Sequence, residues 1–205
     1  MSVESQQANT LAVAKARLRQ NAEAILGLVD QLDESFLKAV KLLRDCSGKV
    51  LATGMGTSGA TARRIAHLLA VGGTPATFVH AADGLHGSLG LVAPGDVLIS
   101  ISKGGESDEL NEYSRRAKES GAVLISMTAQ PASTLAQLSD VALIAVTSEA
   151  ADPGGMMAMG SAIANCSLGD ALVVSVMEYR SDAWDKFRHN HPGGAVGKAI
   201  EDEEA

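Results

Sequence analysis

Five short apolar runs recur at roughly 20- to 25-residue intervals from Lys49 onward, and they constrain the fold more than any other feature. The runs are KVLAT, PATFVH, DVLISIS, AVLISM and VALIAV. Longer segments with helical spacing separate them, which is the rhythm of β-α-β units. Nearly every residue in these runs is apolar, as in strands buried on both faces. The sequence therefore predicts an α/β fold in which helices sandwich a five-stranded parallel sheet.

The segment that precedes these runs has a different texture. Of the 21 glycines only Gly27 lies before position 48, and all five prolines come after position 74. Its apolar residues recur every three to four positions, so we expect two helices, joined near residues 30–33, with one buried face each. We assign residues 1–46 to N-terminal helices used in oligomer packing and residues 47–205 to a single ligand-binding domain.

Composition and charge exclude several classes of protein. With 17 basic and 24 acidic residues the net charge is −7, so neither nucleic acid nor an anionic membrane is an expected partner. The closing run of acids, residues 201–204, is expected to be a solvated tail. Cys46 and Cys166 show no metal-ligand spacing, so we expect reduced cysteines and no bound metal. Neither a signal peptide nor a membrane span is predicted, which favours the cytoplasm.

Two glycine-rich loops follow predicted strands and open helices. The first is GMGTSG, residues 54–59, and the second is SKGGES, residues 102–107. Ligands of open α/β sheets bind at the carboxyl ends of strands, where helix N-termini favour anions. Two such loops, one of which carries Lys103, indicate a site for a single phosphate monoester. The alternative is that Ser102 and Ser107 only cap a helix, with Glu106 favoured there by the helix dipole.

The first loop also matches the GxGxxG pattern of dinucleotide-binding proteins. That interpretation requires an acidic residue at the end of the second strand, and Asp83 comes too late for this role. A nicotinamide-dependent oxidoreductase is therefore disfavoured.

Histidines and glutamates supply candidates for proton transfer. His86 and His191 both lie in glycine-rich surroundings that allow a ligand to approach the backbone closely. Glu149 comes just after the last predicted strand, at the edge where a site is expected. The alternative for each histidine is a structural role, and the alternative for Glu149 is that it is a solvated loop acid.

Taken together, these segments resemble the sugar isomerase (SIS) domain family, in its arabinose-5-phosphate isomerase-like branch. The resemblance covers about residues 15–198 and rests on LATGMGTSGATARRIA, FVHAADGLHGSLGLV, LISISKGGESDEL, SEAADPGG, LGDALVVSVME and HPGGAVGK. It implies a three-layer, flavodoxin- or Rossmann-like sandwich that binds a sugar phosphate. It further implies aldose–ketose isomerisation through a cis-enediol, without a cofactor, by a homotetramer assembled as a dimer of dimers.

The resemblance also implies roles for individual residues. Ser58, Ser102 and Ser107 match phosphate-binding hydroxyls. The catalytic candidates around the sugar are Glu106, Glu149, His86 and His191. We lean towards Glu149 as the base, although Glu106 is the alternative. The remaining expected substrate-binding residues are Gly56, Thr57, Lys103, Gly104 and Asp152.

Three departures from the family pattern lie in the two loops and in the wall of the expected pocket. The branch usually has GMGKSG where this chain has Thr57, and SNSGE where it has SKGGE, so we hypothesise that Lys103 replaces the missing lysine. The family segment CPLGLAPTSSTT is replaced by ADPGGMMAMGS, where Asp152 either contacts a sugar hydroxyl or caps a helix.

Two further expectations concern regulation and class. The chain stops before the cystathionine-β-synthase-type pair that many relatives carry, so we expect no nucleotide regulation through that module. A non-catalytic sugar-phosphate sensor remains the alternative to an isomerase. The acidic net charge argues against gene regulation, and a binding module has no need of two glutamates.

Overall fold

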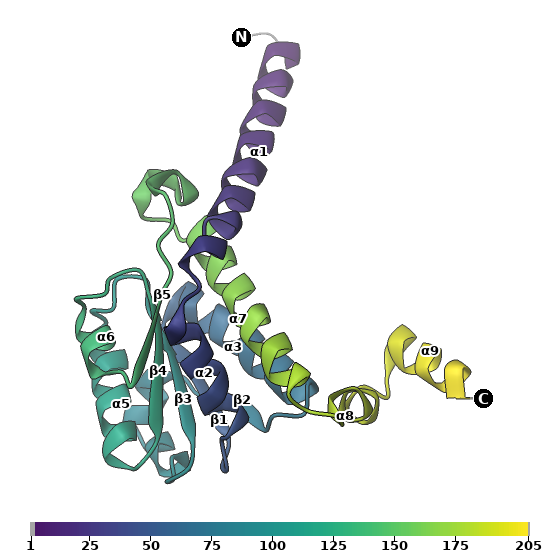
Figure 1. Ribbon diagram of the computed structural model, residues 1–205. Helices are drawn as coiled ribbons and strands as arrows, with labels where there is room; N and C mark the ends of the chain where they lie inside the picture. Colours follow the sequence, from purple (N-terminus) through teal and green to yellow (C-terminus); the bar gives the residue numbers. More distant parts are fainter. Residues whose placement is uncertain (1–2, 205) are drawn as a thin grey trace.

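Five parallel strands form the centre of the molecule, in the order β2-β1-β3-β4-β5 (Figure 1). The computed structural model describes the backbone of residues 3–204 and the side chains of residues 5–200. All five predicted strands are present: β1 (Val50–Gly54), β2 (Ala76–Phe78), β3 (Val97–Ile101), β4 (Val123–Thr128) and β5 (Val141–Ile144). The predicted fold class is confirmed, and every carboxyl end lies at one edge of the sheet because all pairings are parallel.

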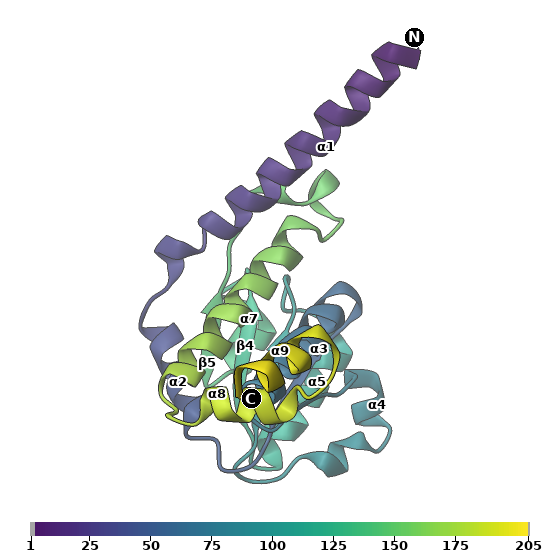
Figure 2. The same ribbon diagram turned by 90° about the vertical axis from the view of Figure 1, so that its right-hand side faces the viewer.

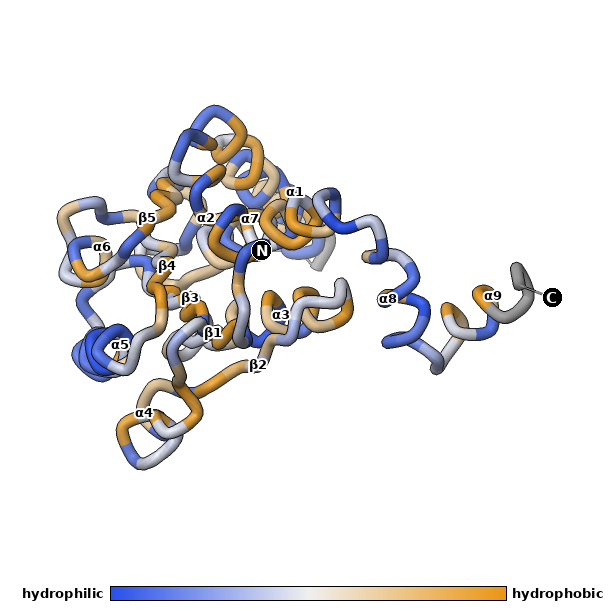
Figure 3. The backbone as a smooth tube through the Cα atoms, turned by 60° about the horizontal axis from the view of Figure 1, so that its bottom comes forward, coloured by the Kyte–Doolittle hydropathy of each residue, from blue (hydrophilic) through white to orange (hydrophobic). Residues whose placement is uncertain are grey.

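The central strands β1, β3 and β4 bury side chains on both faces of the sheet, which explains their unbroken apolar runs. Alternate residues of β3 separate cleanly: Val97 and Ile99 join one cluster, and Leu98 joins the other. The first cluster lies under α2 (Glu34–Arg44), α3 (Gly56–Val71) and α7 (Gly160–Glu178). The second lies under α4 (Ala81–Leu85), α5 (Asp108–Glu119) and α6 (Thr134–Leu138). Figure 3 shows the strands as largely hydrophobic and α5 as largely hydrophilic.

The N-terminal segment is helical, as predicted, but the first helix is much more exposed than expected. Its elements are α1 (Val3–Leu26), the 3₁₀ turn η1 (Val29–Gln31) and α2, so the two helices meet near residues 30–33. Only the C-terminal part of α1 packs on the body, against α7, and the rest projects outward (Figures 1 and 2). Leu11 and Leu18 are 61% and 69% exposed, so the outer part of the predicted apolar face has no partner among the described residues of one chain.

Helix α7 is long and apolar enough to cross a membrane by length and composition alone. Half of that stretch is buried, where it packs against α1, α2 and α3. Its residues Leu168, Leu172 and Val176 belong to the hydrophobic core. A core helix of a folded domain has these same properties, and α7 is such a helix.

The chain ends in two helices that extend away from the sheet, α8 (Ala183–Asn190) and α9 (Gly194–Glu204) (Figure 1). The acidic run 201–204, expected to be a solvated tail, has a helical backbone in α9, and its side chains lie outside the described residues. Helix α7 begins beyond the carboxyl end of β5 and its 19 residues span about 28 Å. It therefore delivers α8 and α9 to the opposite, amino-terminal edge of the sheet.

Candidate active site

The first glycine loop turns sharply from β1 into α3. Gly56 has φ +52°, a conformation that L side chains rarely adopt. A side chain at Gly59 would begin 2.6 Å from the carbonyl oxygen of Gly54, so helix and strand meet too closely for any residue but glycine. Among the described residues, no side chain forms a capping hydrogen bond at the start of α3, where Gly56 and Thr57 are exposed and Ser58 is half-buried. The start of the helix therefore presents backbone N–H groups and the Ser58 hydroxyl to an anion.

The second loop, between β3 and α5, is held by its own serine. The Ser102 hydroxyl accepts a hydrogen bond from the backbone N–H of Gly105 at 3.1 Å and lies 3.5 Å from the Ser107 hydroxyl. Gly105 has φ +70°, and a Cβ there would lie 2.2 Å from Ser133 Oγ. The Ser107 side chain forms no capping bond to α5, and Gly104 is exposed. The alternative that Ser107 serves only as a helix cap therefore does not account for its hydroxyl, which forms no capping hydrogen bond.

Lys103 reaches from this loop to the start of α7. Its Nζ donates to Asp152 Oδ2 at 2.7 Å, where the lysine side chain is 42% exposed and the aspartate side chain only 1%. The other Asp152 oxygen accepts the backbone N–H groups of Met159 at 2.8 Å and Ser161 at 3.1 Å. Although burial raises the pKa of Asp152, these bonds outweigh it and hold that pKa well below its usual range.

The Asp152 carboxylate thus caps α7 from a distance in the sequence. Of the two roles left open by the sequence, this geometry is that of a helix cap, with an additional ion pair to Lys103.

The two glutamates have different surroundings. Glu106 Oε1 accepts the backbone N–H of Thr134 at 2.8 Å, at the start of α6. This hydrogen bonding to Thr134 lowers the pKa of Glu106, which makes its carboxylate a weaker base. Glu149 begins the 3₁₀ turn η3 (Glu149–Ala151) just past β5 and is exposed. Both residues lie after carboxyl ends of strands, as expected.

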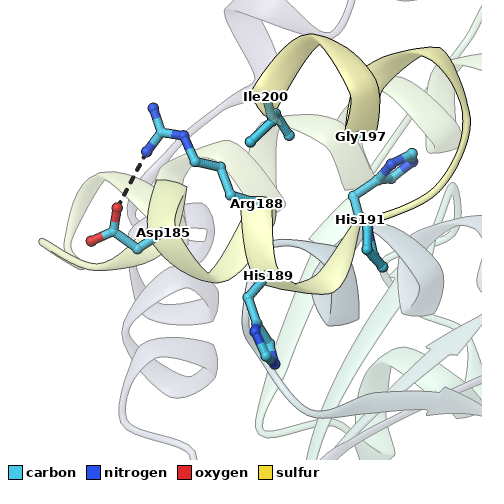
Figure 4. Close-up of a pocket in the computed structure, with 7 residues that line it drawn as sticks. Asp185, Arg188, His189, His191, Gly197 and Ile200 are labelled. Carbon is cyan, nitrogen blue, oxygen red and sulfur yellow. Dashed lines mark hydrogen bonds and ion pairs between the residues drawn. The ribbon is translucent and has the colours of Figure 1, made fainter. Parts of the chain in front are cut away.

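The structure does not bring His191 to these loops within one chain. This histidine lies between α8 and α9, at the far edge of the sheet. Its ring stacks on Phe187 with 5.7 Å between centroids, and its Nδ1 is buried without a hydrogen-bond partner in the described part of the chain. It lines a cavity of about 330 Å³ together with Asp185, Arg188, His189, Pro192, Gly197 and Ile200. Figure 4 shows His191 in this cavity between α8 and α9.

His86 follows α4 and is exposed, beside Gly87 with φ +123°. Beyond the carboxyl end of β2 lies a cavity of about 270 Å³ lined by Arg63, Phe78, Val79, His80, Asp83, Ser88 and Leu91. The Arg63 guanidinium lies over the Phe78 ring at 3.9 Å. Sequence reasoning missed Arg63, because nothing in a helical run marks which residue faces an edge strand.

Sequence reasoning also missed Arg17. Its guanidinium donates from α1 to the carbonyl oxygens of Ala151 at 2.5 Å and Ala150 at 3.3 Å. This arginine fixes the segment between Glu149 and Asp152, and a contact over 134 positions leaves no local signal. Among the described residues, no three His, Cys, Asp or Glu side chains lie together as a metal site would require.

The fold and these loops define a parallel α/β domain with a candidate anion-binding site at the carboxyl edge of its sheet, and comparison with known proteins gives its family. The family model for the SIS domain matches residues 42–175. This chain therefore belongs to the SIS domain family, and the resemblance stated from the sequence is confirmed.

Two curated relatives and one solved structure are similar to most of this chain. The chain is 34% identical to arabinose 5-phosphate isomerase KdsD of Pseudomonas aeruginosa over 96% of its own length and 60% of that protein. It is 36% identical to KdsD of Escherichia coli K12 over 87% of its length and 54% of that protein. The chain thus spans little more than half of these relatives. The solved structure of Escherichia coli CFT073 c3406 in complex with arabinose 5-phosphate superposes with TM-score 0.86 at 31% identity, covering 94% of this chain and all of that one.

Proposed function

We propose that this protein is an aldose–ketose isomerase of phosphosugars, acting on a pentose phosphate or a close analogue. The observation that carries the proposal is the pair of glycine loops after the neighbouring strands β1 and β3. One presents the uncapped start of α3, and the other presents Ser102, Ser107 and Lys103. The likeness to arabinose 5-phosphate isomerases over most of the chain supports the same conclusion.

In this proposal the phosphate is the anchor of the substrate. Ser58, Ser102 and Ser107 donate hydroxyl hydrogens to it, the backbone of residues 56–58 donates N–H groups, and Lys103 supplies a positive charge. Binding energy from the phosphate, which is remote from the reacting carbons, orients the open-chain sugar. The sugar then extends towards Glu149, Glu106 and the wall that contains Asp152.

The chemistry is a proton transfer between adjacent carbons. A carboxylate removes the proton from C2 of the aldose, a cis-enediol forms, and the proton returns to C1 while an acid moves hydrogen between the two oxygens. We assign the base to Glu149, because the hydrogen bond from Thr134 weakens Glu106 as a base. One carbon of the substrate is reduced while its neighbour is oxidised, so the reaction needs no cofactor.

We further propose that the working enzyme is a homotetramer, a dimer of dimers, in the cytoplasm, without nucleic acid or membrane as a partner. The exposed leucines of α1 support an interface between copies. The position of His191 at the far edge of its own sheet supports its contribution to the site of a neighbouring copy, and the exposed His86 is the alternative contributor. Such a neighbour would also shield Glu149 from water, as a general base near neutral pH requires.

Two glutamine variants test the proposal. The purified chain is incubated with four- to six-carbon aldose and ketose phosphates, and interconversion is followed by NMR. We expect one substrate pair to react, with kcat lowered at least about 100-fold in Glu149→Gln. A smaller loss is expected in Glu106→Gln. Thermal stabilisation by these compounds without turnover of any of them would contradict the proposal and support a sensor.

A further inference from the structure

The ion pair between Lys103 and Asp152 lies between the phosphate loop and the wall of the site. Lys103 belongs to the loop after β3, and Asp152 lies just before α7. Both residues stand where the sequence departs from its family pattern. The two oxygens of Asp152 receive four hydrogen bonds: two on Oδ1 from backbone N–H groups, and two on Oδ2 from the Ser161 hydroxyl at 2.6 Å and Lys103 Nζ at 2.7 Å.

Asp152 does not depend on Lys103 for its hydrogen bonds. If the ammonium moved away, Oδ1 would keep Met159 and Ser161 N–H, and Oδ2 would keep the Ser161 hydroxyl. The N-terminus of the 19-residue helix α7 would continue to favour its negative charge. The carboxylate therefore stays ionised and fixed whether or not Lys103 contacts it.

The Lys103 ammonium, by contrast, has hydrogen-bond donors that Asp152 does not use. An ammonium carries three donors, and in the described part of the chain its Nζ has Asp152 as its one hydrogen-bond partner. Its side chain is 42% exposed, and it follows Ser102 directly in the loop that also carries Ser107. It can therefore donate to a phosphate oxygen while it stays near the carboxylate.

The carboxylate has two opposed effects on a phosphate bound at this loop. It restricts the rotamers of Lys103, which lowers the entropy lost on binding. It also places a negative charge directly behind the ammonium, which repels a dianion through a poorly solvated wall. A dianion that shares the Lys103 ammonium with Asp152 lies close to this carboxylate, because Nζ and Oδ2 are only 2.7 Å apart. Charge repulsion over so short a span outweighs the rotamer entropy of one side chain, so the net influence of Asp152 is to weaken binding.

We propose that Asp152 is a positioning residue that holds the Lys103 ammonium at the phosphate loop and, through its own charge, limits how tightly the site holds a phosphate dianion. The inference rests on the proposed function, because it assigns the loop to a substrate phosphate. The product carries the same phosphate group as the substrate. A lower affinity of the loop for this dianion therefore favours product release. The interaction is uniform between substrate and transition state, so it acts on KM rather than on kcat.

Three variants test the inference: Asp152→Asn, Lys103→Ala and the double variant. Asparagine keeps an acceptor for the N–H groups of α7 and removes the charge. Ser161→Ala serves as a matched control, because it removes one hydrogen bond to Asp152 and leaves both charges in place. Calorimetry measures the Kd of inorganic phosphate, and kinetics give KM and kcat for the sugar phosphate that the wild type converts.

We expect Asp152→Asn to bind phosphate about tenfold more tightly, with a matching fall in KM and no rise in kcat. The gain should vanish when Lys103→Ala is added, and Ser161→Ala should show no gain. A residue that only supports the fold would lower affinity when it is replaced. Equal or weaker binding by folded Asp152→Asn would overturn the inference, as would a gain that survives without Lys103.

A second measurement, on the wild type, tests the inference if the Asp152→Asn variant does not fold. In a crystal of the wild type grown with phosphate, Lys103 Nζ should lie within hydrogen-bond distance of a phosphate oxygen. Phosphate bound at Ser102 and Ser107 with Nζ only on Asp152 would overturn the inference and leave the proposed function standing. A wild type that neither binds nor converts any sugar phosphate would overturn the proposed function itself.

Discussion

Lys103 supplies the positive charge of a loop whose other donors, hydroxyl and backbone N–H groups, are neutral. A neutral cradle fixes the position of a phosphate, whereas a charge adds strength that falls off slowly with distance. Ser102 shapes the turn by accepting the Gly105 N–H. In the proposed site, Ser107 would donate its hydroxyl hydrogen to the phosphate and Lys103 would attract the dianion.

Replacing Lys103 by alanine tests this assignment at the residue scale. We expect KM for the sugar phosphate to rise about tenfold or more, since a charge-assisted hydrogen bond is lost and the Asp152 charge is left behind. The fold should persist, because Asp152 keeps its other three donors. Steady-state kinetics measure the change, and an unchanged KM would show that Lys103 does not contact the phosphate.

At the scale of elements, the two loops owe their shape to positions where the backbone and its neighbours accept only glycine. Gly105 is such a position, since its φ is +70° and Ser133 lies against it. Its carbonyl oxygen also accepts the N–H of Leu135, which ties the loop to α6. The loop that carries Ser102 and Lys103 is therefore braced by a neighbouring helix as well as by its own strand.

Gly105→Ala should destabilise the protein by about 1–3 kcal/mol and weaken substrate binding, because the strain would displace the serine loop. Gly104→Ala is the matched control for stability: no atom lies within 4 Å of a Cβ there, and its φ is not positive. Chemical denaturation gives the free energy of unfolding. Equal stability of the two variants would contradict the braced loop.

Asp96 joins the amino-terminal ends of β1 and β3. This carboxylate is 1% exposed and accepts from the backbone N–H of Lys49 at 2.9 Å, from Lys49 Nζ at 2.7 Å and from Ala93 N–H at 2.9 Å. Burial raises its pKa, but the bonds from Lys49 and Ala93 outweigh burial and lower it below the usual value. A lowered pKa in the fold means that ionised Asp96 stabilises the native state.

This stabilisation is complete above the unfolded pKa of about 4 and is lost as the pH falls from there through the lower pKa of the folded state. We expect Asp96→Asn to cost about 2 kcal/mol at pH 7 and to make stability less sensitive to acid below about pH 4. Asp30→Asn, at an exposed site with no hydrogen bond to its side chain in the described chain, is the control. Urea denaturation across the acid range measures both, and an unchanged acid dependence in Asp96→Asn would refute this role.

The strands were predictable because β3 and its neighbours bury both faces, so nearly every residue is apolar and the signal is strong. The exposure of α1 could not be predicted, because Leu11 and Leu18 have the same spacing whether they face a core or another chain. The pairing of Lys103 with Asp152 was equally hidden, since 49 positions separate the two residues. Both candidate loops were recognisable from their glycines and serines. The hydrogen bond from the Thr134 N–H to Glu106 was not predictable, because the fold brings together residues that are distant in the sequence.

At the scale of the whole molecule, large apolar and aromatic side chains are exposed on the helices at both extremities of the described chain. Helix α1 exposes Leu11 and Leu18, and the C-terminal arm, which consists of α8 and α9, exposes Trp184 (62%). Exposed apolar surface of this kind is typical of an interface between subunits. The arm also carries His191 away from its own loops, so assembly and completion of the site are expected to be coupled.

Light scattering after size exclusion tests this coupling. The wild type should have four times the mass of one chain, and the double variant Leu11→Asp, Leu18→Asp should fall to smaller species with a large loss of kcat. Asn9→Asp adds one charge on the other side of α1 and should remain tetrameric. A fully active monomer would show that no neighbour contributes to the site.

Deuterium exchange during turnover tests the enediol mechanism most directly. The wild type is incubated in D₂O with the aldose phosphate and the ketose phosphate that it interconverts, and NMR follows the C1 and C2 positions. We predict solvent deuterium at C1 of the ketose and C2 of the aldose, together with interconversion, and loss of both in Glu149→Gln. Interconversion without any exchange of the carbon-bound hydrogen, or with full exchange in Glu149→Gln, would contradict an enediol mechanism based on Glu149.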